Sequence, residues 1–470
     1  MDFLARYLET DRNFYRRLLL IAVPVILQTM ITTGVNLVDN IMLGQLTETV
    51  LSGSTQANQF IALFNYTIMG ISMGASVLSS RFLGAQDFSS LKKAVAIALR
   101  FCLLLGLALT LANVFLTRQI LSLYFRPEAL GEIQAGITYL RWSTACYLLM
   151  AVSVVLTNIM RSINMSNLPL VAAICAFAIN IGANYVLIFG KFGFPEMGVA
   201  GAALGTVIAR VMETSLLTWA FLHNKRVLYQ LRDFLLPCRD LVPTFLRISV
   251  PVMLSDCLLG MGDNMLAIIM GQIGSSFVSA NAITTLVQRT STIFISGLSF
   301  SGCFLTGQMM GEGRVQEARK QGYTYLFLGT AVGIVAALLI RLAGGIIIDG
   351  YKITEETKQI ADQLMNGLCV IAIFRVANSI LTKGVLRGGG DTRFLLMADM
   401  STMWLLAVPL GALGGLILHL PAFYTYLLLY CDQIVKAFWC VWRLRSGKWI
   451  KKIGLDLVEP PSHWIQKRPR

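Results

Sequence analysis

Residues 21–25 of this chain read Ile-Ala-Val-Pro-Val, and residues 248–252 read Ile-Ser-Val-Pro-Val, 227 positions later. The register persists in three further pairs: 41–46 with 268–273, Gly84 with Gly311, and Arg161 with Arg387, the last at an offset of 226. A register held this long indicates that one ancestral bundle was duplicated. In membrane proteins built from such repeats, the functional cavity lies between the two halves.

The composition is that of a protein that crosses the membrane many times. Mean hydropathy is +0.67 and charged residues make up 14% of the chain, against roughly 25% in a soluble domain. We predict an all-α integral membrane protein of about twelve spans. The predicted spans are 18–43, 52–80, 94–117, 134–160, 168–190, 198–222, 245–270, 278–310, 322–345, 361–385, 394–418 and 422–442. Membrane strands are excluded because the segments are long and continuously apolar.

The basic residues are distributed unevenly between the loops. The net charge is +14, and 28 Lys and Arg residues fall in segments on the side of the N-terminus, against 7 on the other side. This asymmetry follows the positive-inside rule and predicts that both termini are cytoplasmic. The positive charge is therefore explained by topology, and we expect no nucleic-acid partner.

Six spans per half bring both halves into the membrane in the same sense, so we expect a pseudo-two-fold axis along the membrane normal. We predict an N-terminal lobe at 1–225, a cytoplasmic linker at 226–244, a C-terminal lobe at 245–445 and a basic cytoplasmic tail at 446–470. Glycines four residues apart, such as Gly201 and Gly205, allow helices to approach closely. The run Gly388-Gly389-Gly390 predicts a flexible cytoplasmic turn.

The first span carries the most informative polar residues. Gln28, Thr32, Asn36 and Asp39 share one helical face, and Pro24 lies one turn before them. Because Pro24 removes a backbone hydrogen bond, it can act as a hinge. A buried carboxylate on a bendable helix favours ion binding at Asp39; the structural alternative is a carboxylate satisfied by neighbouring amides.

The sequence places no basic residue beside Asp39, and other spans supply further polar side chains. Asn180 and Asn184 lie one turn apart, and Thr206 is in the next span; their oxygens suit Na⁺ or a network around a protonated acid, although paired asparagines also serve as interhelical hydrogen-bonding groups. In the seventh span Asp256 and Asp263 share a face, and a functional and a structural role are equally open for both. Leu266 stands opposite Asp39 in the repeat. The predicted cavity residues are Gln28, Asn36, Asp256, Asp263, Asn281 and Gln288.

The remaining intramembrane charges are interpreted as structural. Arg210 can pair with Glu213, Asp432 can pair with Lys436, and Arg375 could pair with Asp399 across helices. No catalytic or nucleotide-binding constellation is present, so we expect neither an enzyme nor a resident cofactor. The nine cysteines are scattered, and no metal ligand set is expected beyond a possible Na⁺ at Asp39.

Several stretches resemble the multidrug and toxic compound extrusion (MATE) family across nearly the whole chain. These are Val-Asp-Asn-Ile-Met-Leu-Gly at 38–44, the turns at Gly84 and Gly311, residues 180–195, Gly-Val-Ala-Gly-Ala-Ala at 198–203 and Gly-Val-Leu-Arg-Gly-Gly-Gly-Asp-Thr at 384–392. The most specific part is the segment from Phe194-Pro195 to Ala203.

The resemblance implies two six-helix lobes, a central cavity and cation-coupled export of organic compounds. Its DinF-like branch, which we favour, uses an acid in span one with polar residues of spans five and six; by position these are Asp39, Asn180, Asn184 and Thr206. The family often has Asp where Asn184 stands. Another branch places acids where this chain has Leu259 and Val376, so the ion site is better assigned to the first half.

The leading interpretation is a monomeric multidrug exporter of the cell membrane, driven by H⁺ or Na⁺, with small organic substrates and membrane lipids as its partners. The alternative is a flippase for lipid-linked precursors with the same architecture. Flippases tend to line the cavity with basic residues for phosphate, whereas the candidates here are acids and amides. With one carboxylate in the first-half site, the charge argument favours H⁺ over Na⁺.

Overall fold

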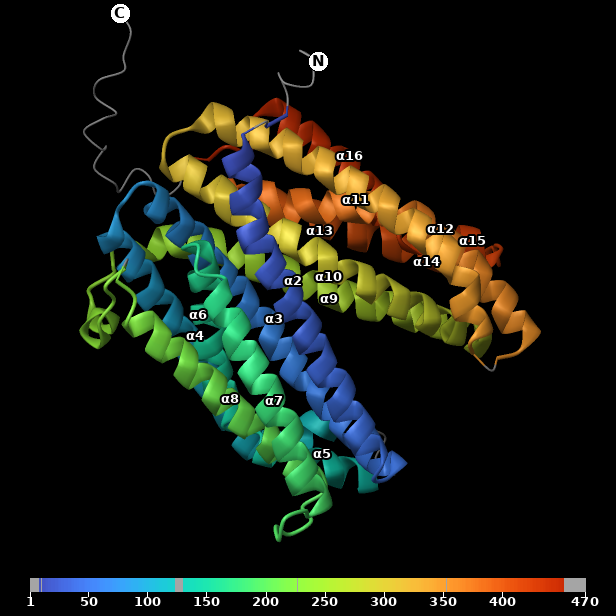
Figure 1. Cartoon of the computed structure of the whole chain (residues 1–470). Coiled ribbons are helices and arrows are strands. Elements are labelled where there is room, and N and C mark those ends of the chain that lie inside the picture. Colours follow the sequence, from blue (N-terminus) through green and yellow to red (C-terminus); the bar gives the residue numbers. More distant parts are fainter. Residues whose placement is uncertain (1–7, 10, 123–129, 226, 352, 452–470) are drawn as a thin grey trace, which may run out of the picture. The chain divides into compact units, whose positions relative to one another are not determined.

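The computed structural model describes residues 8–9, 11–122, 130–225, 227–351 and 353–451, and in this part of the chain the regular elements are all helical. Figure 1 shows their arrangement along the chain. The N-terminal repeat forms α2 (Arg12–Gly44), α3 (Glu48–Gly84), α4 (Phe88–Ser122), α5 (Leu130–Trp142), α6 (Cys146–Ser162), α7 (Asn167–Phe189) and α8 (Val199–Leu222). These helices confirm the predicted all-α class.

The C-terminal repeat follows a short 3₁₀ helix, η1 (Leu231–Leu235). It comprises α9 (Val242–Ile273), α10 (Ser275–Gly311), α11 (Val315–Asp349), α12 (Glu355–Ser379), η2 (Ile380–Leu386), α13 (Thr392–Thr402), η3 (Met403–Ala407), α14 (Val408–Ala412), η4 (Leu413–Ile417), α15 (Ala422–Leu429) and α16 (Cys431–Ser446). The segments η2, η3 and η4 are π-helical turns that continue the helices around them.

Ten helices of the described chain are long and apolar enough to cross a membrane. Helices α5 and α6, which meet at a bend of 59°, are together long and apolar enough for an eleventh span if the bent pair crosses as one. The twelfth predicted span, 422–442, is divided between α15 and α16. Ten of the twelve predicted spans therefore coincide with long apolar helices of the described chain, the fourth corresponds to the bent pair, and 422–442 is not a single long apolar helix.

Contacts group the chain into two compact units. The N-terminal unit holds residues 24–79 and 87–253, and the C-terminal unit holds 1–23, 80–86 and 254–470. Helix α2 passes from one unit to the other at Pro24, and α9 does so two residues after Pro251. The boundaries at 225 and 245, which describe the repeats, stay a prediction.

Glycines on α8 confirm the close helix approach expected from their spacing. A Cβ atom at Gly201 would meet the backbone of Leu187 on α7 at 2.5 Å, and one at Gly205 would meet the side chain of Asn184. Helices α7 and α8 are thus held at a distance that only small residues on α8 permit.

The prediction of a flexible turn at Gly388–Gly390 is wrong, because this turn is buried. Arg81 donates from Nη2 to the carbonyl of Gly388 over 3.0 Å, and a Cβ atom at Gly388 would meet the backbone of Cys303. The glycines are needed here for close packing within the C-terminal unit, and so the turn is fixed by its neighbours.

The first residues of the predicted tail also belong to this packed region. Trp449 is fully buried, and its ring lies against Gly389. The amide of Lys451 donates to the carbonyl of Gly389 over 3.0 Å, and Arg81 donates to the carbonyl of Lys451 over 3.0 Å. The solvated tail predicted from residue 446 therefore starts no earlier than residue 452, and 452–470 lie outside the described residues.

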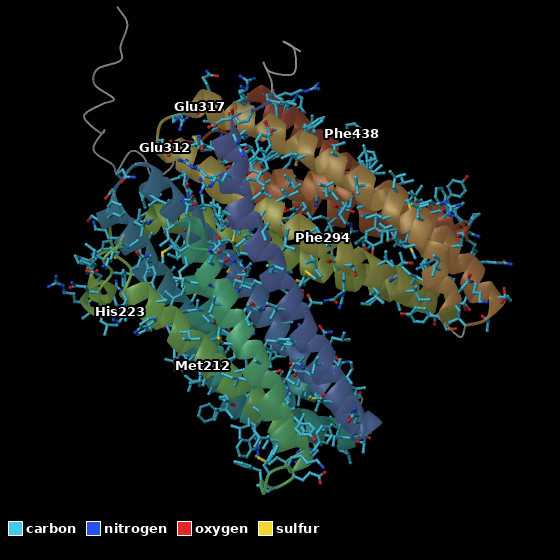
Figure 2. All side chains as sticks on the ribbon, in the orientation of Figure 1. Met212, His223, Phe294, Glu312, Glu317 and Phe438 are labelled. Carbon is cyan, nitrogen blue, oxygen red and sulfur yellow. The ribbon has the colours of Figure 1, made fainter. Side chains whose placement is uncertain are left out.

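Large apolar side chains cover the outside of the helices. Among those labelled in Figure 2, Met212 on α8, Phe294 on α10 and Phe438 on α16 are all exposed, Phe438 by 65% of its surface. Exposed apolar side chains along spanning helices are expected to face lipid. By contrast, Glu312 and Glu317 flank the turn between α10 and α11, where Arg314 pairs with both.

Candidate ion site in the N-terminal unit

Asp39 lies near the end of α2 and is contacted by an amide of α7. Asn184 donates from Nδ2 to Oδ1 of Asp39 over 2.6 Å, and the same nitrogen lies 3.4 Å from Oδ1 of Asn180. Asn184 and Asn180 are fully buried, whereas Asp39 is half-buried. The structure therefore brings together three of the four residues predicted for the ion site.

The position of Asn184 depends on a glycine of the next helix. Because Gly205 on α8 has no Cβ atom, Oδ1 of Asn184 fits against it. The oxygen of Asn184 is directed to α8 and its nitrogen to Asp39. As a result the carboxylate receives a hydrogen-bond donor from this amide rather than a second oxygen.

The fourth predicted residue, Thr206, lies next to the neighbours of Asp39 and is not hydrogen-bonded to Asp39 itself in the described structure. Its hydroxyl donates to the carbonyl of Ala202 over 3.0 Å, and Tyr139 on α5 is within hydrogen-bonding reach of both Thr206 and Asn58. Tyr139 is buried and interacts electrostatically with Asp39. Sequence reasoning missed Tyr139 and Asn58, because a lone Tyr or Asn in an apolar helix carries no spacing signal.

A cation also lies near this carboxylate. Arg210 on α8 pairs with Glu213 over 2.7 Å, as predicted, and acts electrostatically on Asp39 as well. The sequence interpretation treated Arg210 as purely structural. In the structure, the positive charge of Arg210 also stabilises negative charge on Asp39.

The polar face of α2 is divided between different neighbours. Nη2 of Arg161 on α6 donates to Oε1 of Gln28 over 2.6 Å, so Gln28 is held by an arginine rather than lining open space. Thr32 donates to the carbonyl of Gln28, and Asn36 is exposed. Of the four residues of the stripe, only Asp39 reaches the asparagines of α7.

In the C-terminal repeat, the arginine that corresponds to Arg161 binds a carboxylate. Arg387, which follows η2, donates to both oxygens of Asp256 on α9, at 2.9 and 3.3 Å. Arg387 is buried and Asp256 nearly so. Asp256, one of the two acids left open by the sequence, is thus bound to an arginine in this structure.

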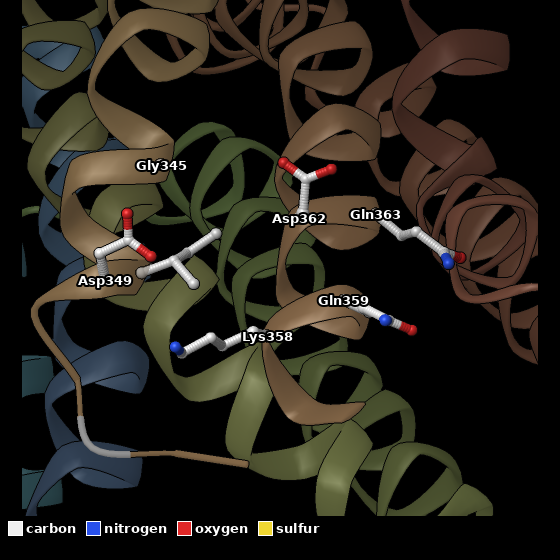
Figure 3. Close-up of a pocket in the computed structure, with 7 residues that line it drawn as sticks. Gly345, Asp349, Lys358, Gln359, Asp362 and Gln363 are labelled. Carbon is white, nitrogen blue, oxygen red and sulfur yellow. The ribbon is translucent and has the colours of Figure 1, made fainter. Parts of the chain in front are cut away.

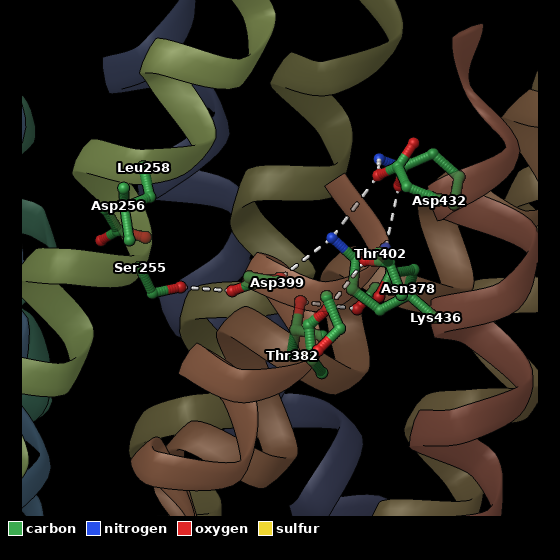
Figure 4. A network of polar contacts seen from close by, with 12 residues as sticks. Ser255, Asp256, Leu258, Asn378, Thr382, Asp399, Thr402, Asp432 and Lys436 are labelled. Atoms are coloured by element: carbon green, nitrogen blue, oxygen red, sulfur yellow. Dashed lines mark hydrogen bonds and ion pairs between the residues drawn. The ribbon is translucent and has the colours of Figure 1, made fainter. Parts of the chain in front are cut away.

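A second group of charges lies deeper in the C-terminal unit, as Figure 4 shows. Lys436 on α16 donates to Asp399 on α13 over 3.0 Å and lies 3.7 Å from Asp432, confirming the predicted pair within α16. Ser255 donates to the other oxygen of Asp399, and Gln433 donates to Asp432 over 2.6 Å. Each buried carboxylate therefore has both a cation and a neutral donor.

The pairing of Arg375 with Asp399, which the sequence left open, is not found among the described residues. Lys436 takes Asp399, and the guanidinium of Arg375 lies over the ring of Tyr430, 4.9 Å from its centroid. The two cations stand on neighbouring helices, and sequence spacing alone does not decide which of them reaches α13.

The remaining predicted cavity residues are dispersed. Asp263 is exposed on α9, with Arg375 and Lys383 acting on it electrostatically. On α10, Gln288 is half-buried, and Oδ1 of Asn281 is buried without a hydrogen-bond partner among the described residues. No contact with Asp256 gathers them into one site in the described part of the chain.

An open pocket of about 440 Å³ lies at the ends of α11 and α12. Figure 3 shows Asp349 of α11 and Lys358 and Asp362 of α12 around it. None of the predicted site residues lines this pocket. The described residues also contain no group of three His, Cys, Asp or Glu side chains arranged to hold a metal.

The geometry is that of a polytopic helical membrane protein with a repeated bundle and one carboxylate that accepts a hydrogen bond from a buried amide. A family model described as MatE matches residues 24–186 and again residues 251–413, so the second match begins and ends 227 residues after the first. The chain belongs to the MatE family. The double match confirms the duplication predicted from the sequence.

Curated relatives cover most of the chain at low identity. The probable multidrug resistance protein NorM of Thermotoga maritima is 24% identical over 450 residues, which is 94% of each chain. The probable multidrug resistance protein YoeA of Bacillus subtilis is 24% identical over 409 residues, 86% of this chain and 87% of that protein.

Solved structures agree in fold. A MATE crystal structure in the bent conformation aligns with a TM-score of 0.83 at 18% identity, covering 93% of this chain and 96% of that one. An outward-facing multidrug resistance MATE transporter aligns with a TM-score of 0.81 at 18% identity, covering 92% and 96%. At this identity the likeness establishes the fold and not the substrates.

Proposed function

We propose that this chain is a secondary active multidrug efflux transporter that exports organic, often cationic, compounds in exchange for a cation by alternating access. Family membership supports a transporter, and the names of the curated relatives support multidrug export. Its substrates are small organic molecules, and it works as a monomer in the cell membrane.

The observation that carries the proposal is the contact between Asp39 and Asn184. A carboxylate with an amide partner and no direct salt bridge can gain or lose a cation at moderate free-energy cost. The acids of the C-terminal unit are in a different state, because Asp256 and Asp399 are each bound by a cationic side chain. We therefore place the coupling site at Asp39, with Asn180, Asn184 and Thr206 around it.

We propose H⁺ as the coupling ion. Na⁺ requires several oxygen ligands that replace its hydration shell. At Asp39, the nearest amide presents its nitrogen and not an oxygen, and one carboxylate supplies the negative charge of the site. A proton needs only the carboxylate, which becomes neutral when the proton binds.

Contacts made by the two ends of the described chain support the proposal that both lie on the cytoplasmic side. The amide of Glu9 donates to Oγ1 of Thr324 over 2.7 Å, and the carbonyl of Arg445 accepts from Arg319 over 3.0 Å. Thr324 and Arg319 both belong to the first part of α11, which supports the proposal that the two ends emerge on one face of the membrane. The excess of basic residues there assigns this face to the cytoplasm. Pro24 serves as the hinge of α2 in the transport cycle.

The test is efflux of a fluorescent organic cation from proteoliposomes under a pH gradient alone and under a Na⁺ gradient alone. We expect efflux with the pH gradient, and a loss to background in Asp39→Asn. Glu196→Gln removes an exposed carboxylate from the loop between α7 and α8, and it should transport as the native chain does. Efflux driven only by Na⁺ would overturn the choice of ion, and full activity in Asp39→Asn would overturn the site.

A further inference from the structure

The connector between α8 and α9, residues 223–241, is fastened to α4 by its polar groups. Within it, Asp233 pairs with Lys92 over 2.9 Å and Asp240 pairs with Lys93 over 2.6 Å. Figure 1 shows the connector in yellow-green where it joins the two helices. The segment predicted as a cytoplasmic linker is thus held to α4 of the N-terminal unit.

Further along α4, the backbone of the connector is also bound. Arg100 donates from Nε to the carbonyl of Phe234 and from Nη2 to the carbonyl of Leu236, both over 2.8 Å. Its guanidinium also lies over the ring of Phe234, 5.5 Å from the centroid. The contacts with α4 extend from Lys92 to Arg100, roughly 12 Å along a helix that rises about 1.5 Å per residue.

Three leucines of the connector point away from the protein, whereas Val227 and Leu241 near its ends are buried. Leu228, Leu231 and Leu235 are exposed by 62%, 73% and 78%, while Tyr229 and Asp233 are buried. The second acid of the connector, Asp240, is exposed by 51% of its side chain beside Lys93. Over residues 228–235, however, the pattern is the reverse of that expected for a loop in water, which would bury leucines and expose its carboxylate. This inverted pattern indicates that the outer side of the connector meets an apolar medium.

The length of α4 places the connector at a depth in the bilayer that is consistent with an apolar surrounding. Helix α4 has 35 residues and so is about 52 Å long, whereas the hydrocarbon core of a bilayer is about 30 Å thick. Its first turns therefore lie at headgroup level. Lys92 and Lys93 are in those turns, and Arg100 is two turns deeper, where the apolar run has begun. The leucines that lie alongside are at the boundary between headgroups and acyl chains.

The exposed side chains of the connector that remain outside these ion pairs carry positive charge. Both acids of the connector form ion pairs with lysines of α4. Although burial acts to raise the pKa of Asp233, the amide of Gln230 and the ammonium of Lys92 hold it below its ordinary value. The exposed charged side chains that remain are basic: Lys225, Arg232 and Arg239, with Arg247 at the start of α9. Basic residues beside an apolar face complement anionic lipid headgroups.

We propose that residues 223–241 form an interfacial anchor, with Leu228, Leu231 and Leu235 among the acyl chains of the cytoplasmic leaflet and the basic residues on anionic phospholipid headgroups. The partner is the lipid surface itself. The anchor fixes the depth of α4, α8 and α9, and it does not depend on which compound or ion is transported.

The test uses the full chain, in a variant whose nine cysteines are replaced, with nitroxide labels at Leu231→Cys, Leu235→Cys or the loop control Glu196→Cys. In vesicles of phosphatidylcholine and phosphatidylglycerol, we expect oxygen to relax the two connector labels severalfold more, relative to a water-soluble nickel complex, than it relaxes the control. Omitting phosphatidylglycerol should reduce this ratio, and Arg232→Gln with Arg239→Gln should remove its dependence on phosphatidylglycerol.

Greater access of the nickel complex than of oxygen at both positions would overturn the proposal, because the leucines would then face water. Protection from both reagents would also overturn it, because protein would then cover them. A second variant avoids the cysteine replacements. In the otherwise native chain, the additional fluorescence of Leu235→Trp should be quenched by lipids brominated near the headgroup, and quenching by aqueous acrylamide alone would contradict the anchor.

Discussion

The two repeats place their buried charges at different positions. At the 227-residue offset, Asp39, Asn180 and Asn184 correspond to Leu266, Ala407 and Gly411. Leu266 and Ala407 are buried in the apolar core of the C-terminal unit. Conversely, Asp399 corresponds to Ala172, which is buried in α7. The N-terminal repeat therefore keeps a carboxylate bonded to an amide where the C-terminal repeat is apolar, besides its Arg210–Glu213 pair, and the C-terminal repeat holds Asp256 and Asp399 in ion pairs.

This difference separates two uses of a buried carboxylate. A charge bound by a lysine or arginine is fixed, because releasing it would leave two uncompensated ions. A carboxylate whose hydrogen-bond donor is a neutral amide can bind a small cation and release it again. The comparison predicts that substitutions in the C-terminal network mainly change stability, while those around Asp39 mainly change transport.

The largest effect should come from moving the carboxylate to the equivalent position. Leu266→Asp places an uncompensated charge in an apolar core and should lower the free energy of unfolding by about 4 kcal/mol or more. The reciprocal change, Asp39→Leu, should leave thermal stability near native and abolish efflux. Thermal unfolding in detergent and efflux from proteoliposomes measure the two properties. A stable Leu266→Asp chain, or an active Asp39→Leu chain, would break the comparison.

Removing the lysine of the C-terminal network should have the next largest effect. Lys436→Met leaves Asp399 and Asp432 with neutral donors only, and it should cost about 3 kcal/mol of unfolding free energy. Adding Asp399→Asn should restore part of that loss. Lys358→Met is the matched control, because its pair with Glu355 is exposed and is worth about 0–1 kcal/mol. If both lysine variants unfold at the native temperature, the network is not a stabilising one.

The smallest effect is expected at the glycine behind Asn184. Gly205→Ala places a methyl group against Oδ1 of Asn184, and it should cost about 1–2 kcal/mol while slowing efflux. Gly182→Ala, on the helix of Asn184, has no neighbour within 4 Å and should be neutral or stabilise by up to about 1 kcal/mol. Equal behaviour of the two variants in thermal unfolding and efflux would show that Gly205 does not position Asn184.

Much of the fold could be predicted, because repeated residues and long apolar segments are local features of a sequence. The contact of Asp39 with Asn184 was accessible through the spacing of polar residues and the family resemblance. Tyr139 and Arg210 were not accessible as neighbours of Asp39, because their approach depends on how α5 and α8 pack. The buried turn at Gly388 was missed for a similar reason: glycine predicts flexibility unless other segments fill the space around it.

Trp449 determines how far this chain can be shortened. Its ring is buried against Gly389, and the backbone of Lys451 binds both Gly389 and Arg81. A truncation after residue 446, at the end of α16, would remove that side chain and expose the triple-glycine turn to water. A truncation after residue 451 would keep these contacts. Engineered versions of the chain for crystallisation or for fusion to a reporter should therefore place the junction beyond residue 451.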